Sequence, residues 1–175
     1  MANSDKPNGL TPIGTLSGSD YHGKMRPVAF AAGDAVAAYV GDLVKLTGTV
    51  DATGKIPVVA QSAAGDASIG VLVSLDFDAS DEGGLMTPLT RAASTARTGQ
   101  VVFGQDVLYK IQEDSDSNAI EITEAGLNCN IIVGTASNVT GSGMELDSTS
   151  AAGTSTLNVR LHHVFDSPDN VLGTN

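Results

Sequence analysis

The stretch SIGVLVSLDFD, residues 68–78, carries the clearest strand pattern in the chain. Its large apolar residues fall at every second position, from Ile69 to Phe77. Alternation with a period of two over nine or more residues predicts a β-strand that buries one face. Residues 105–114 and 156–165 alternate in the same way, and the second pattern breaks at His163 and Val164. The side chains expected in the core are Ile69, Val71, Val73, Leu75, Phe77, Val107, Tyr109, Ile111, Leu157, Val159 and Leu161.

Shorter apolar runs surround these three strands. They cover residues 26–32, 42–48, 55–61, 99–104, 119–123 and 130–134. Residues 34–41 fit a short helix or a strand equally well. The polar stretches DATGK (51–55) and EDSDSN (113–118) have the chemistry of hairpin loops, so we expect two similar hairpins around them. Short strands at spacings near ten residues predict a barrel or a sandwich, with less than about 15% helix.

The composition agrees with an all-β domain. The chain has 175 residues, of which 41% are hydrophobic and only 17% charged, and it contains 20 glycines and no tryptophan. Many glycines with few aromatic residues are typical of a β-protein with many turns. We therefore predict one all-β domain, a small β-barrel or β-sandwich of which a β-tulip-like form is one version, with an extended N-terminal arm.

The net charge of −11 excludes some classes of partner. Nucleic acid and anionic membranes are disfavoured, because both are bound through lysine and arginine. The charge is uneven: residues 1–26 hold three basic and two acidic residues, a balance of +1, and the remainder holds six and 18, a balance of −12. The arm therefore suits an acidic neighbour.

Cys129 is the single cysteine, so no disulfide framework exists. The first residues lack the apolar core of a signal peptide, and no window is long and apolar enough for a membrane span. We expect assembly in a cytoplasm, with Cys129 as a small buried residue.

The N-terminal stretch MANSDKPNGLTPIGTLSGSDYHGK, residues 1–24, has isolated apolar residues and no period. Its glycines and prolines favour extended chain. One interpretation is a frayed terminus. The other is an arm that contacts its own body little and becomes ordered on a neighbouring subunit, with residues 25–175 forming a single β-rich domain. The residues predicted to bind the neighbour are Lys6, Pro7, Leu10, Pro12, Ile13, Leu16, Tyr21 and Lys24.

Catalytic and metal-binding patterns are weak. No nucleophile elbow, phosphate-binding loop or dinucleotide fingerprint is present. His162 and His163 are adjacent on an expected strand, so their side chains should point to opposite faces and not serve one metal. We predict no catalytic residues, no cofactor and no metal site.

Two stretches are rich in acidic residues, and the first has oxygen atoms that calcium could use. The first alternates oxygen-bearing residues at Asp76, Asp78, Ser80 and Glu82. An EF-hand loop needs glycine at its sixth position, where this chain has Asp81, so a solvated strand end is the preferred interpretation. The second, Glu113 to Asp116, is interpreted as a solvated turn.

Several pieces of the chain, in their order, resemble the head decoration or capsid cement proteins of tailed phages. They are MANSDKPNGLTPIGTLSG, GDLVKLTG, IGVLVSLDF, FGQDVLYKIQED, AGLNCNIIVG, GMELDSTS and DSPDNVLGTN. The first holds the segment L-x-P-x-x-x-L-x-G at Leu10, Pro12, Leu16 and Gly18. Chains of this kind often run on into one more apolar strand, whereas this sequence stops at Asn175.

The resemblance implies a structural protein on the outer surface of a virion. Such a protein binds the major capsid protein at capsomer junctions and stabilises the mature head. The symmetry of those sites implies a homotrimer. Two other classes remain open: a receptor- or glycan-binding module of a virion, which predicts exposed aromatic residues, and a trimeric β-fold hydrolase, which predicts a compact acid-and-glycine motif.

Overall fold

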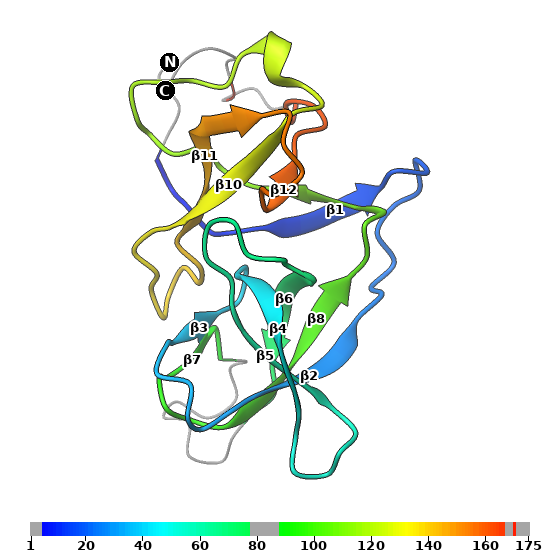
Figure 1. Ribbon diagram of the computed structural model, residues 1–175, viewed down its shortest axis with the longest axis vertical. Helices are drawn as coiled ribbons and strands as arrows, with labels where there is room; N and C mark the ends of the chain where they lie inside the picture. The colour runs from blue at the N-terminus through cyan, green and yellow to red at the C-terminus, as the bar shows by residue number, and fades with distance from the viewer. Residues whose placement is uncertain (1–4, 78–87, 167–169, 171–175) are drawn as a thin grey trace.

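The computed structural model describes residues 5–77, 88–166 and 170, and it is almost entirely β-structure (Figure 1). The strands are β1 (Thr11–Thr15), β2 (Arg26–Phe30), β3 (Ala38–Tyr39), β4 (Leu43–Val50), β5 (Pro57–Gln61), β6 (Gly70–Leu75), β7 (Thr90–Arg91), β8 (Arg97–Phe103), β9 (Val107–Lys110), β10 (Asn128–Val133), β11 (Met144–Ala152) and β12 (Val159–Arg160). The three-residue 3-10 helix η1 (Ile122–Glu124) is the only helix in the described ranges. The all-β prediction is confirmed.

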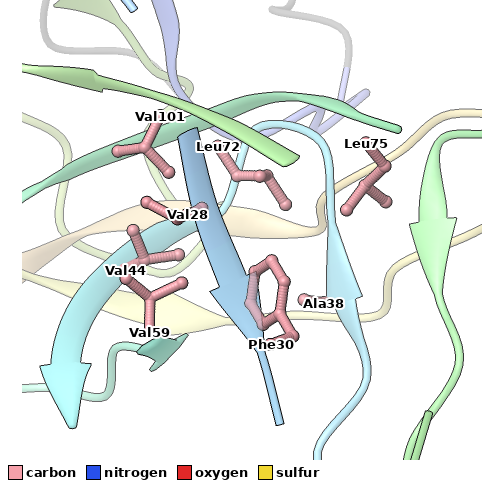
Figure 2. Close-up of a cluster of buried hydrophobic side chains, with 8 residues drawn as sticks. All are labelled: Val28, Phe30, Ala38, Val44, Val59, Leu72, Leu75 and Val101. Carbon is pink, nitrogen blue, oxygen red and sulfur yellow. The ribbon is translucent and has the colours of Figure 1, made fainter. Parts of the chain in front are cut away.

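Five strands close a small barrel in the order β2-β5-β4-β6-β8. All neighbours in it run antiparallel except β2 and β5, which pair in parallel through Ala29 and Val58. Figure 2 shows the side chains that fill the interior: Val28, Phe30, Ala38, Val44, Val59, Leu72, Leu75 and Val101. Each large apolar side chain buried in this way contributes roughly 1.5–3 kcal/mol.

A second layer lies across one end of the barrel (Figure 1). It consists of the pair β1-β9 and the sheet β11-β10-β12, and Figure 1 shows β1 crossing between that sheet and the barrel. Its own core cluster is made of Leu10, Leu43, Val71, Ile131 and Met144. The remaining pair, β3-β7, lies beside the barrel (Figure 1), and the Val40 carbonyl directly after β3 accepts the Ser142 N–H of the second layer at 2.9 Å. It resolves the choice for residues 34–41 in favour of a very short strand.

Strand β6 faces both layers, and its pairing with β8 shifts between Leu72 and Ser74. Val71 enters the second cluster, whereas Leu72 and Leu75 both point into the barrel. The bulge leaves Val73 half-buried, and Phe77 is 59% exposed. Leu75 is buried as predicted, but Leu72, predicted on the opposite face, is buried with it in the barrel. The predicted single buried face over residues 69–77 is therefore wrong, since one extra residue in a strand reverses the alternation that follows.

Of the other predicted core residues, Ile69 packs against the barrel cluster and three lie beside the second cluster. Val107 is buried, and Tyr109, Ile111 and Val159 are half-buried against that cluster. Leu157 and Leu161 are also half-buried. The strand expected over 156–165 is reduced to the two residues of β12.

Hairpin predictions had mixed outcomes. The loop 51–55 joins β4 and β5 as predicted. Residues 113–118 do not form a hairpin loop: β9 pairs with β1, and the chain after it runs beside β11 through Asp114 N–H to the Leu146 carbonyl, 2.9 Å. The strand expected over 119–123 is wrong, because η1 begins at Ile122. Strands β1 and β11 were not predicted.

Candidate functional site

The N-terminal segment is anchored to its own body at Gly9 and Leu10. Leu10 is 3% exposed and packs with Leu43 and Met144 in the second cluster. Its N–H donates to the Gly41 carbonyl at 2.9 Å. Gly9 has a φ of +70°, and a side chain there would collide with the Gly41 carbonyl, so only glycine permits this approach. The prediction that the arm contacts its own body little is therefore wrong.

The segment continues as the edge strand β1, which pairs antiparallel with β9. Thr11 lies opposite Lys110 and Pro12 opposite Tyr109, and the register shifts between Pro12 and Gly14. Proline has no N–H to donate, so it is tolerated on such an edge. The expected extended conformation is present, but its partner is the same chain.

Beyond β1 the chain turns back in a compact loop, residues 16–25, at the edge of the molecule (Figure 1). Thr15 makes the hydrogen bonds that close the start of this loop. Its N–H donates to the Ser19 carbonyl at 3.0 Å, and its hydroxyl is hydrogen-bonded with those of Ser17 and Ser19 at 2.8 Å each. Gly18, with a φ of +83°, makes the turn. Leu16 at the start of the loop is 55% exposed.

Asp106, in the turn between β8 and β9, ties this loop to the body. Its carbonyl accepts a hydrogen bond from Leu16 N–H at 2.8 Å, and its carboxylate lies 3.8 Å from Lys24 Nζ. Both members of that ion pair are exposed, so it contributes little. Further along, the Tyr21 hydroxyl donates to the Lys24 carbonyl at 3.3 Å, and Met25 is 48% exposed. The loop is thus fixed at both ends and displays apolar side chains.

An open groove of about 410 Å³ lies beside this loop. One side is formed by residues 8–12 with Tyr21, Gly23 and Met25, and the other by barrel residues and the 140–141 turn. Its lining is mostly apolar, and burial raises the pKa of the Tyr21 hydroxyl. The other lining residues are Leu72 and Val73 of β6, Val40 and Gly41 between β3 and β4, and Leu89 before β7. Such a groove suits an apolar side chain or an extended segment of another protein.

The eight residues predicted to bind a neighbour divide into two groups. Leu10 is a core residue of its own chain, and Pro7, Pro12 and Tyr21 are half-buried against the body. The exposed members are Lys6, Ile13, Leu16 and Lys24. Lys6 N–H donates to Gln112 Oε1 at 2.9 Å, so even this early residue lies on the body. The predicted set did not include Met25, because residue 25 was assigned to the β-rich domain. The signal that the sequence offers for it is an apolar residue directly after the arm.

The acidic turn Glu113 to Asp116 is more buried than predicted. Asp114 is buried, and its Oδ1 accepts the Ser148 N–H at 3.0 Å. Carboxylate oxygens of Glu113, Asp114 and Asp116 lie within 4.8 Å of one another, the only such group of three or more found among the described residues. Burial raises the pKa of Glu113 to about 7, and the charges of Asp114 and Asp116 add to the shift. This is the set of oxygens that a hard cation would use.

The remaining candidates have simple outcomes. Cys129 is buried as predicted, and burial raises the pKa of its thiol to about 11, so it is a poor nucleophile. Asp78, Ser80 and Glu82 of the first acidic stretch lie outside the described residues. His22 is exposed in the 16–25 loop. The prediction that His162 and His163 diverge is wrong, because β12 ends at Arg160 and their Nδ1 atoms lie 2.6 Å apart.

Comparison with known proteins gives no relative: no protein-family model matches the chain, and neither does a curated protein or a solved structure. Within the described ranges, no helix is long and apolar enough to cross a membrane.

Proposed function

We propose that the protein is a capsid decoration protein that binds the outer surface of a phage head. It contacts the major capsid protein at capsomer junctions and stabilises the mature shell. The sequence resemblance motivates this proposal. The structural observation that supports it best is the anchored 16–25 loop, which displays Leu16 and Met25 beside a largely apolar groove.

The anchoring changes the mechanism expected for the arm. A free arm loses roughly 1–2 kcal/mol of backbone entropy for each residue that becomes ordered on binding. Here β1 and the turn around Thr15 already hold the loop, so most of this cost is met during folding. Burial of Leu16 and Met25 in a capsid then contributes roughly 1.5–3 kcal/mol each with little ordering to offset.

The charge of the protein and the symmetry of capsids add two further elements to the proposal, the kind of neighbour and the oligomeric state. The protein is acidic, with a balance of −12 over residues 27–175, whereas residues 1–26 have a balance of +1 and suit an acidic neighbour. Capsid sites are related by rotation, so we include a homotrimer in the proposal. Light scattering of the full chain should give three times the 17.7 kDa of one chain at high concentration. The mass of one chain on the capsid itself would contradict the trimer.

Co-sedimentation with expanded capsids tests the binding surface. The double variant Leu16→Ser with Met25→Ser removes the displayed apolar side chains. The matched control is Leu46→Ser with Val50→Ser on β4, where the two side chains are 50% and 59% exposed. We expect the first variant to bind capsids at least tenfold more weakly and the control to bind as the original protein does.

Both variants change exposed residues, so both should keep the circular dichroism spectrum of the original protein. Equal binding by all three proteins would overturn the proposed surface. Failure of the original protein to sediment with any expanded capsid, together with glycan binding or substrate turnover, would overturn the proposed function.

A further inference from the structure

The two adjacent histidines after β12 form a compact pair. His162 Nδ1 and His163 Nδ1 lie 2.6 Å apart, and the ring centroids are 4.9 Å apart in an edge-to-face arrangement. Both side chains are exposed. On a regular strand neighbouring side chains point to opposite faces. Here the strand ends at Arg160, and two further backbone bonds hold Leu161: its N–H donates to the Leu127 carbonyl, and its carbonyl accepts the Gly126 N–H. The two rings beyond it turn toward each other.

The short distance allows only one proton between the two nitrogens. One Nδ1–H donates to the other Nδ1, which must be unprotonated. When that proton is lost, two unprotonated nitrogens of exposed rings lie side by side, and a small rotation of each ring aims both lone pairs at one metal ion. Histidine nitrogen is the common protein ligand for zinc, copper and nickel.

The separation of the two nitrogens favours one coordination geometry over another. Metal–nitrogen bonds of about 2.0–2.1 Å hold two nitrogens about 2.9 Å apart at 90° and about 3.3 Å apart at 109°, so the hydrogen-bonded pair at 2.6 Å needs the smaller movement to reach 90°. Tetragonal sites need about 90° and tetrahedral sites about 109°, so the pair is closer to tetragonal geometry. Tetragonal nitrogen and oxygen sites favour Cu²⁺ and Ni²⁺.

We propose that His162 and His163 together bind one Cu²⁺ or Ni²⁺ ion through their Nδ1 atoms. Because both rings are exposed, water fills the other positions. The site is independent of the proposed capsid surface, since the residues of that surface lie in the 16–25 loop and the groove beside it. It also differs from the Glu113 to Asp116 group, whose carboxylates prefer hard cations.

Titration of the full chain with Cu²⁺ in a non-coordinating buffer tests the site. We expect one ion per chain and an axial electron paramagnetic resonance spectrum with nitrogen hyperfine structure. His162→Asn and His163→Asn should each weaken binding at least tenfold. The matched control, His22→Asn, removes an exposed histidine elsewhere and should leave the affinity unchanged.

Two further readouts make the test decisive. Circular dichroism should be the same for all variants, because the three histidines are exposed. Glu113→Gln reports on the acidic group and should not change Cu²⁺ affinity. The proposal is overturned if neither His162→Asn nor His163→Asn weakens binding, if His22→Asn or Glu113→Gln weakens it as much, or if the spectrum shows no nitrogen ligand.

Discussion

The barrel and the layer across its end are built in different ways. The barrel interior is filled from β2, β3, β4, β5, β6 and β8, which lie within one continuous part of the chain. The second cluster joins Leu10 from the N-terminal segment to Ile131 and Met144 from β10 and β11. Figure 1 shows these segments meeting although they are far apart along the chain. One region follows from local alternation, and the other exists only once distant segments have met.

The largest expected effect is on folding, and it differs between two neighbouring residues of β6. Leu72 is fully buried in the barrel, whereas Val73 at the bulge is half-buried beside the groove. Leu72→Asp should abolish folding, because it places an unpaired charge among apolar side chains. Val73→Asp, which the alternation alone predicts to be equally damaging, should leave a folded protein. Circular dichroism and soluble yield measure both, and an unfolded Val73→Asp variant would show that the strand has no bulge.

The next effect concerns the β3-β7 pair beside the barrel, where Arg91 is fully buried. Its guanidinium donates to the carbonyls of Ala31, Val36 and Thr95 at 2.6 Å each and lies 3.3 Å from Asp34 Oδ2. Arg91→Met should lower the free energy of unfolding by about 3–5 kcal/mol, because three carbonyls and the Asp34 carboxylate lose the buried donor that joins them.

Urea denaturation measures this loss, and the exposed Arg26 on β2 supplies the control. Arg26→Met should change the stability by less than about 0.5 kcal/mol. Equal losses for the two variants would show that the buried arginine has no special role in joining the loops around this pair.

A third effect tests whether the N-terminal segment belongs to the folded body. Leu10→Ala should cost about 2–5 kcal/mol, as expected for a leucine removed from a packed cluster. Leu16→Ala, in the exposed loop of the same segment, should cost less than about 0.5 kcal/mol. Thermal unfolding compares the two. Deletion of residues 2–20 should for the same reason destabilise the body. An unaltered melting temperature would instead support the prediction of a free arm.

Local patterns predicted the parts of the fold that local chemistry determines. The β4-β5 hairpin is the clearest case. Asp51 Oδ1 accepts the N–H groups of Lys55 and Ile56, so every group in these bonds belongs to the turn itself. These bonds and that with the Thr53 hydroxyl hold the pKa of Asp51 at about 2. The bulge in β6 was not predictable, because it arises from pairing with β8. The alternation of residues 69–77 is equally consistent with a regular strand.

The sequence predicted that the candidate site lies in the N-terminal segment, but it did not predict that this segment packs on its own body. An isolated leucine among glycines and prolines gives no periodic signal, so Leu10 could not be recognised as a core residue from the sequence. Its burial depends on Met144, in a strand whose serines and threonines hid its alternation. The histidine pair was predicted wrongly because the alternation suggested a strand that continues through His162 and His163, whereas β12 ends at Arg160.

The smallest expected effect belongs to Glu113 in the second layer and depends on pH. Its pKa is about 7 in the folded protein, mainly through burial, against an ordinary value of 4.5. The folded state therefore binds this proton more tightly than the unfolded state does. The resulting stabilisation is complete below about pH 4.5 and is lost as the pH rises through 7. Glu113→Gln cannot ionise, so relative to the original protein it should gain stability between pH 5 and pH 8.

The gain should be modest, because the side chain is only partly buried and solvent screens its charge. A melting temperature raised by roughly 2–4 °C at pH 8, with little difference at pH 5, is the expected size for a domain of this length. The other carboxylates titrate in both proteins, so the difference between the two curves isolates Glu113. The exposed Glu121 provides the control, and Glu121→Gln should give a difference that does not change over the same range. A Glu113→Gln difference equally flat with pH would mean that the acidic turn is solvated, as its sequence alone predicts.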